Sequence, residues 1–430
     1  MKKRVFILGQ CTLHWGRMEF GNIGNYYILE PLFSELRRVF PETDLVTTMQ
    51  LSDDFCNRFE LKTVPMELYF DFNSDDNLEK AKNEYQIACK KSGETTPFIE
   101  EVKKADLIID FSGDIWGDNA DFLGKDRFVT GCYKDLVAQI FAPTVMIAGS
   151  PGPFGNEKNK TLAQKAYSGF KYVSNREPIS TRILEDNGFD ISNTHNYPCP
   201  SFLFQKSDDE KIKRVIPLIK KEDEDLIIGF ILCGWNFKRG PFDAWPREDI
   251  EFENYLRLIE NLIEDKNAHI VLLSHSNGFD IPPAPFVLKH GRDYPIMNQL
   301  YSLLKREGYS SKITLLDGVY SPAETKAIIS HFDVLISGRM HGAVAGLSQN
   351  IPTVIIDYGH EPKAHKLKGF AEIVGDKDII ADPNDLNDLR IKTENVIENR
   401  LTVKKNLMKR NQDIFVNVHA QFDDLAQYLK

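Results

Sequence analysis

The sequence lacks the cysteine patterns that mark a metal site or a disulfide framework. Its six cysteines are scattered along 430 residues, with no CxxC pair and no His/Cys cluster at zinc spacing. This usage is typical of reduced, mostly buried thiols in a cytoplasmic protein, and no metal site is expected. The apolar run near the start spans only Val5 to Leu8, far short of a signal-peptide core. No stretch approaches the roughly 18 consecutive apolar residues of a membrane span, so we expect a soluble or at most peripheral protein.

Two nucleotide-binding motifs and an excess of basic residues are also missing. Neither GxGxxG nor GxxxxGK[ST] occurs, so dinucleotide and ATP chemistry lose support and no cofactor is predicted. The 53 lysines and arginines are outnumbered by 63 aspartates and glutamates, which gives a formal net charge of −10. A general nucleic-acid binder would need a basic face, so that class is disfavoured. An anionic ligand would have to be bound by a local group of cations.

The pattern of apolar runs predicts an α/β protein with two Rossmann-like domains. A chain of 430 residues exceeds one ordinary core and suggests two domains of about 200 residues each. Short apolar runs alternate with segments of helical period, which is typical of βα units and a parallel sheet. The expected strands are 4–9, 44–49, 105–113, 143–150 and 171–176, then 226–232, 268–275, 312–318, 333–338 and 352–358.

The same pattern gives domain limits. We expect an N-terminal Rossmann-like domain at 1–205 on the acceptor side, a C-terminal one at 225–385 on the donor side, and a helical tail at 386–430. Helices are predicted at 25–39, 75–91 and 179–187, and Ser321 with Glu324 forms a capping box before a further helix. The tail carries a candidate packing face of Val416, Phe422, Leu425 and Leu429. Two such domains facing a central cleft would place their strand ends, and the chemistry, around it.

A group of cations stands out in this acidic chain between residues 337 and 366: Arg339, His341, His360, Lys363, His365 and Lys366. A strand, a short loop and a helix starting near His341 or Gly342 would aim unpaired N–H groups at the loop, which makes an anion site. Arg339 offers a planar fork for phosphate or carboxylate, His341 can exchange a proton, and Gly342 lets a ligand approach the backbone. The structural alternative is an arginine paired with a nearby acid and a histidine satisfied by backbone.

Glycine and asparagine precede the first predicted helix in GNIGN, which contains Gly21, Asn22, Gly24 and Asn25. Such a loop permits the tight turn and close approach that a phosphate, or a sugar held by backbone amides, requires. The same residues also serve as an ordinary turn and helix cap.

Carboxylates and an indole follow the strand 105–113. Asp110, Asp114 and Asp118 could supply a general base or hold sugar hydroxyls, and Trp116 could stack on a sugar face. Helix capping is an equally good reading of any single aspartate.

Two further strand ends carry a candidate cation or histidine. Arg176 lies before Pro178, where an anion contact competes with a surface salt bridge. His275 lies beside the proline-rich segment IPPAPF, which could form a lid.

Taken together, GNIGN, DFSGD, SNREPIS, SGRMHGAVAGLSQNIPTVIIDY and HKLKGFAEIVG resemble the polysaccharide pyruvyl transferase family. The order of these motifs covers nearly the whole chain and is more specific than any one of them. The resemblance implies a GT-B-like fold and transfer of a pyruvyl (ketal) group from phosphoenolpyruvate to hydroxyls of a sugar or polysaccharide precursor. The context implied is cytoplasmic exopolysaccharide biosynthesis.

The resemblance also implies roles for individual residues. Donor binding falls to Arg339, Lys366 and Arg176, and catalysis falls to His341. From the residues themselves we add Gly342 on the donor side and Asp114 as a candidate base. On the acceptor side the resemblance places the glycine–asparagine loop, and we add three candidates from strand ends: Asp110, Trp116 and His275.

The sequence departs from the family pattern at two places. GHEPKAH lengthens the spacing before Lys366, which makes Lys363 a rival for the donor lysine. The double glycine expected near Ser112 and Gly113 is incomplete, so the acceptor side is less defined.

Other functions fit the same pattern. A GT-B-type glycosyltransferase or a sugar-nucleotide epimerase would also use a basic strand-end loop, and a non-catalytic member could bind a glycan. The expected partners are phosphoenolpyruvate and a sugar or lipid-linked oligosaccharide, without nucleic acid; a homo-oligomer is compatible with the sequence.

Overall fold

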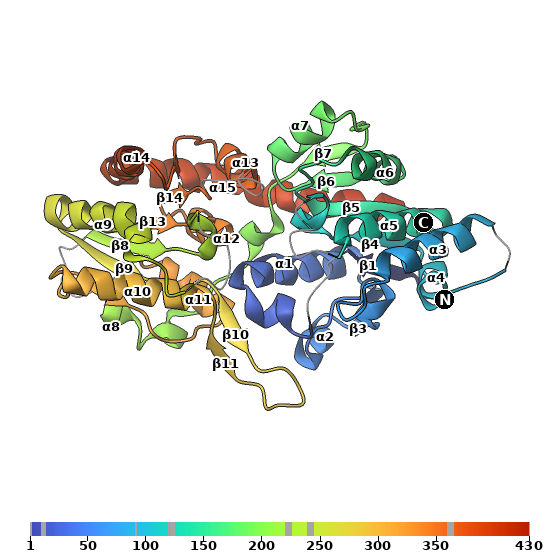
Figure 1. Ribbon diagram of the computed structural model, residues 1–430, viewed down its shortest axis with the longest axis horizontal. Coiled ribbons are helices and arrows are strands. Elements are labelled where there is room, and N and C mark those ends of the chain that lie inside the picture. Colours follow the sequence, from blue (N-terminus) through green and yellow to red (C-terminus); the bar gives the residue numbers. More distant parts are fainter. Residues whose placement is uncertain are drawn as a thin grey trace. The chain divides into compact units, whose positions relative to one another are not determined.

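The computed structural model describes residues 2–9, 14–90, 93–118, 120, 125–219, 226–238, 245–358 and 365–429. The chain divides into two compact units (Figure 1). The first unit contains Met1–Met18, Leu32–Pro200 and Val416–Lys430, and the second contains Glu19–Pro31 and Ser201–Phe415. This division differs from the expected limits because two short segments, 19–31 and 416–430, each join the unit that is built mainly by the other half of the chain.

The first unit is organised around a seven-stranded parallel sheet with strand order β3-β2-β1-β4-β5-β6-β7. Its strands are β1 Arg4–Leu8, β2 Asp44–Thr47, β3 Leu61–Thr63, β4 Leu107–Asp110, β5 Thr144–Gly149, β6 Val173–Asn175 and β7 Thr194–Asn196. All five strands predicted for this half are confirmed. The two edge strands β3 and β7 were not predicted, because each has only three residues and no apolar run.

Helices pack on this sheet and enclose its core. They are α2 Asp53–Arg58, α3 Asn77–Lys90, α4 Pro97–Lys103, α5 Arg127–Phe141, α6 Glu157–Tyr167 and α7 Pro178–Asp186. Helix α5 contacts α3, α4 and α6. Residues of β1, β4 and α5, among them Phe6, Ile108 and Val137, meet in one buried apolar cluster. Burial of such clusters is the main force that holds a unit of this kind together.

The second unit contains a six-stranded parallel sheet with strand order β12-β9-β8-β13-β14-β15. Its strands are β8 Leu226–Ile231, β9 Ala268–Leu272, β12 Ile313–Leu315, β13 Val334–Ser337, β14 Thr353–Ile356 and β15 Ile380–Ala381. The five strands predicted for this half are confirmed. An additional antiparallel pair, β10 Asn277–Phe279 and β11 Leu288–His290, forms a separate ribbon (Figure 1).

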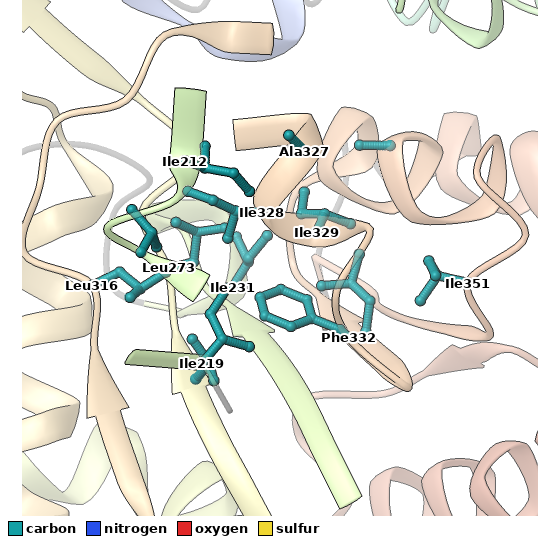
Figure 2. Close-up of a cluster of buried hydrophobic side chains, with 14 of the residues drawn as sticks. Ile212, Ile219, Ile231, Leu273, Leu316, Ala327, Ile328, Ile329, Phe332 and Ile351 are labelled. Atoms are coloured by element: carbon teal, nitrogen blue, oxygen red, sulfur yellow. The ribbon is translucent and has the colours of Figure 1, made fainter. Parts of the chain in front are cut away.

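The helices of the second unit are α8 Ile216–Ile219, α9 Glu253–Lys266, α10 Asp293–Arg306, α11 Pro322–Ile329, α12 Met340–Leu347, α13 His365–Ile373 and α14 Leu386–Glu398. The predicted capping box is confirmed, since Ser321 Oγ accepts from Glu324 N at 3.3 Å and Glu324 Oε2 accepts from Ser321 N at 2.8 Å. Behind this cap, Ile328 and Phe332 join Ile231 of β8 in a buried apolar core (Figure 2).

Two helices run from one unit into the other. Helix α1, Ile23–Val39, begins in the second unit and ends in the first, and α15, Arg400–Asp423, does the same. The predicted packing face of the tail is partly wrong, because Val416 is exposed. Phe422 and Leu425 are buried as predicted, and Val418 joins them; the spacing of these three residues, four and three positions, follows one face of a helix. No helix among the described residues combines the length and apolarity of a membrane span.

Candidate functional site

The strand order of the second sheet reverses between β8 and β13, and ligands of open α/β sheets bind at the carboxyl ends of such a pair. The loops that follow these two strands pack tightly here. Cys233 N donates to Asn236 Oδ1 at 2.9 Å, and Cys233 Sγ donates to the carbonyl oxygen of Gly338 at 3.2 Å. A Cβ on Gly338 would lie 2.0 Å from Asn236 Oδ1, so this position requires glycine.

Arg339 is the N-cap of α12 and forms a buried ion pair at this edge. Its Nε donates to Asp293 Oδ2 at 3.0 Å and its Nη2 donates to Asp293 Oδ1. The Asp293 side chain is fully buried. Burial opposes the charge of Arg339, but the attraction of Asp293 outweighs it and raises the pKa of the guanidinium above its ordinary value. Arg339 therefore stays charged, and Nη1 is the nitrogen that Asp293 does not engage.

Asp293 was not predicted as a site residue. It begins α10 and lies 46 positions before Arg339, so nothing local in the sequence links the two. A carboxylate at a helix start reads as an ordinary first-turn residue.

His341 lies in the first turn of α12, half-buried, with its ring 6.3 Å from that of Phe370. Gly24 at the start of α1 approaches this imidazole closely. A Cβ on Gly24 would lie 2.7 Å from His341 Cβ and 2.8 Å from Nδ1, distances that real side chains do not adopt. Gly24 is thus required by its contact with His341, whereas the sequence suggested a contact with ligand.

The loop around Gly24 belongs to the second unit. Asn22 pairs with Ser276 in an antiparallel bridge, and its Oδ1 accepts from Gly24 N at 3.0 Å. The buried Gly21 and half-buried Asn25 flank this cap. The sequence grouped these residues with the N-terminal half and the acceptor, but the structure brings the loop to the catalytic candidate His341.

Gly342 and Lys366 complete the predicted donor group within this unit. A Cβ on Gly342 would lie 2.7 Å from Ser337 Oγ, so this glycine is explained by packing of α12 on β13. Lys366 is buried in the first turn of α13. His360 and Lys363 lie outside the described residues.

His275 follows β9 and is fully buried, with neither ring nitrogen hydrogen-bonded to any described residue. The Tyr27 ring meets it edge to face at a centroid distance of 5.4 Å. Burial, assisted by the positive charge of Arg339, lowers the pKa of His275 to about 3. The imidazole is therefore neutral at physiological pH.

The sheet of the first unit reverses its order between β1 and β4, where Asp110 lies. Asp110 is fully buried and accepts from Ser112 N at 2.8 Å and from Ser112 Oγ at 2.9 Å. Gly9, at a φ of 107°, covers it so closely that a Cβ would lie 2.8 Å from Asp110 Oδ2. In this structure the carboxylate of Asp110 is enclosed by its own strand ends, and its contact with the acceptor stays a prediction.

A second buried carboxyl group, Asp135 of α5, was not predicted and pairs with Asp110. Burial, with the bond from Ser112 opposing it, raises the pKa of Asp110 to about 6. Burial and then the negative charge of Asp110 raise the pKa of Asp135 well above its ordinary value. Trp116 Nε1 donates to Asp135 Oδ2 at 3.1 Å, so the indole holds one oxygen of this buried carboxyl group.

The Asp135→Asn variant should flatten the pH dependence of stability. Both raised pKa values mean that the folded state binds protons more tightly, so stability is full below the ordinary value near 4 and falls as the pH rises through about 6. An asparagine keeps an acceptor for Trp116 and removes the second buried carboxyl group beside Asp110. Between pH 5 and pH 8, the melting temperature should fall for the natural chain and much less for Asp135→Asn. The variant of an exposed residue, Asp186→Asn, is the control and should behave like the natural chain. An equal fall for Asp135→Asn and the natural chain would contradict the raised pKa values of this carboxyl pair.

Trp116 does not offer its ring to a sugar. It is buried in an aromatic cluster with centroid distances of 5.5 Å to Phe128 and 5.6 Å to Tyr167, so packing of the core accounts for its position. Asp118 Oδ2 accepts from the backbone N–H groups of Gly155 and Asn156, so it holds the loop that precedes α6.

Two more predicted site residues, Asp114 and Arg176, lie in the first unit. Asp114 lies half-buried in the short helix Gly113–Ile115. Arg176 is buried after β6, and its Nε donates to Ser150 Oγ at 2.7 Å. Neither the first unit nor the second contains, among the described residues, a cluster of three His, Cys, Asp or Glu side chains suited to a metal ion.

The two-sheet architecture is shared with GT-B proteins of known structure. A glycosyltransferase from Rickettsia africae aligns with a TM-score of 0.59 at 12% identity, over 99% of this chain and 98% of that one. HepE of Anabaena, in complex with UDP and glucose, gives 0.55 at 11% over 99% and 98%. The UDP-GlcNAc 2-epimerase of Methanocaldococcus jannaschii gives 0.52 at 12% over 92% of each chain. The fold is therefore the predicted α/β, GT-B-like class.

Within this fold class, the amino-acid sequence identifies the family. Residues 22–360 match the model of the polysaccharide pyruvyl transferase family, so the chain belongs to that family, as the order of its motifs indicated. A comparison with curated protein sequences found no significant match.

Proposed function

We propose that the protein transfers a pyruvyl group from phosphoenolpyruvate to two hydroxyls of a sugar or polysaccharide precursor and forms a cyclic ketal. The observation that carries the proposal is the joining, within the second unit, of Arg339 and His341 at the start of α12. This pair lies at the strand-order reversal of a sheet, and the chain belongs to the pyruvyl transferase family. A small donor with a phosphate and a carboxylate suits such a local group of cations.

The donor would be held by charge. Arg339 Nη1, the Lys366 ammonium and the N–H groups that open α12 would bind its anionic oxygens. Because Asp293 already engages two nitrogens of Arg339, we give Lys366 a larger share of this charge than the sequence alone suggested. Binding of the donor by Arg176 stays a prediction from the sequence.

The chemistry then needs a proton and a base. His341 would give a proton to the methylene carbon of phosphoenolpyruvate, which becomes the methyl group of the ketal, as positive character develops at the central carbon. One sugar hydroxyl attacks that carbon and loses its proton to a base, for which Asp114 is the candidate. A second hydroxyl then displaces phosphate, loses its proton and closes the ketal.

The proposal is tested by incubating the full chain with phosphoenolpyruvate and a panel of sugar and lipid-linked acceptors. We expect released phosphate and an acceptor whose mass has increased by a pyruvyl ketal. Stabilisation by a sugar nucleotide but not by phosphoenolpyruvate, with transfer or epimerisation of the sugar, would support the glycosyltransferase or epimerase alternative. Binding of a glycan without turnover of any donor would support a non-catalytic role.

A further inference from the structure

The buried imidazole of His275 is not explained by the fold. Buried polar side chains almost always have hydrogen-bond partners, and leaving one without a partner costs free energy. Both nitrogens of His275 lack one among the described residues. We take an unpartnered imidazole of this kind, buried at a strand end, as an indication that it contacts a ligand.

Neighbouring polar groups have other partners. The Tyr27 hydroxyl donates to the carbonyl oxygen of Pro322 at 3.2 Å. Ser274 Oγ donates to the carbonyl oxygen of Ser276 at 3.1 Å, and Ser276 Oγ accepts from Asp293 N at 3.0 Å. These groups hold the loop after β9 in place and leave the His275 ring nitrogens to another partner.

The identity of that partner follows from charge. Arg339 is near enough for its positive charge to disfavour a second cation at His275. A neutral imidazole still has one N–H group that can donate to an anionic oxygen. Hydrogen bonds of this kind to charged acceptors are stronger than those between neutral groups.

We propose that His275, in its neutral form, donates a ring N–H hydrogen bond to an oxygen of the anionic ligand that Arg339 attracts. This assignment rests on the proposed function and moves His275 from the acceptor side to the donor side of the reaction. It makes His275 a binding residue that recognises the anion without adding charge.

The test measures binding of phosphoenolpyruvate and of inorganic phosphate to the full chain by calorimetry. The His275→Ala variant should weaken binding of phosphoenolpyruvate by about 10- to 100-fold, because it removes a hydrogen bond to a charged group. His275→Gln, which keeps an N–H donor, should lose less. In the natural chain, histidine ring NMR signals should report a neutral His275 whose resonances shift on saturation with phosphoenolpyruvate.

His269→Gln is the matched control, since His269 is also buried on β9 but its Nε2 lies 2.9 Å from Thr314 Oγ1. It should leave affinity unchanged. Unchanged affinity in both His275 variants, with a lowered melting temperature, would overturn the assignment and make His275 structural.

Failure of the proposed function gives a different result. If the natural chain binds a sugar nucleotide and not phosphoenolpyruvate, and His275→Ala weakens that binding, the role of His275 stands while the reaction is wrong. Binding of none of these anions by the natural chain would overturn both.

Discussion

Replacing His341 by alanine is expected to lower the rate of phosphate release from phosphoenolpyruvate by about 100- to 10,000-fold, the range that a positioned general acid contributes. His341 is the group with an exchangeable proton in the first turn of α12, next to Arg339. Because its side chain is only half-buried, the variant should fold and keep its melting temperature within a few degrees. Phosphate release with a competent acceptor, at saturating donor, is the measurement.

His331→Ala is a suitable control for this experiment. His331 lies in the same unit, after α11, with its Nε2 3.4 Å from Asp209 Oδ1, and the proposed mechanism gives it no role. The control should retain ordinary turnover. If His341→Ala also retained it, the proton would come from another group and the assignment of His341 would be abandoned.

Asp293→Ala is expected to be the most destabilising of the substitutions considered. It removes the carboxylate that accepts from Arg339 Nε and Nη2 and leaves a guanidinium largely buried without that counter-charge. Breaking one side of a buried ion pair costs about 3–5 kcal/mol of the free energy of unfolding. Urea denaturation measures this loss, and the double variant Asp293→Ala with Arg339→Met should recover part of it, because no buried charge remains.

Asp249→Ala provides the matched comparison. Asp249 also pairs with an arginine, Arg306, at 2.7 Å, but both side chains are more than half exposed. An exposed pair of this kind contributes about 0–1 kcal/mol. Similar losses for the two variants would show that the Asp293–Arg339 pair is well solvated, and would remove our reason for treating Asp293 as the residue that positions Arg339.

Local patterns in the sequence predicted much of the fold. The ten predicted strands are all present because each is a short buried run of β-branched and other apolar residues between helical segments. The Ser321 cap was predictable because its signal lies within four residues. The placement of residues 19–31 was not predictable, since it depends on packing of Ile23 and Tyr27 into a core formed by residues far along the chain.

The surroundings of a candidate site residue could be predicted only where one local motif determines them. Arg339 and His341 follow a strand and open a helix, so one continuous motif defines their positions. Trp116 also follows a strand, but its aromatic neighbours come from α5, from α6 and from the segment after α7. No local pattern in the sequence reveals these neighbours. Asp135 and Asp293 were not predicted because each interacts with a residue in a distant segment, Asp110 and Arg339 respectively.

The chain crossings at residues 19–31 and 416–430 have a consequence for biosynthesis. Gly24 leaves the ribosome long before His341, the side chain against which it packs. Residues 19–31 of the second unit therefore cannot pack in their native place until the segment around His341 has been synthesised. The first unit in turn lacks Phe422 and Leu425 until residues 201–415 of the second unit have been synthesised. Neither half is therefore expected to complete its native packing as a separate nascent domain, and a chain interrupted between them should yield two incomplete cores.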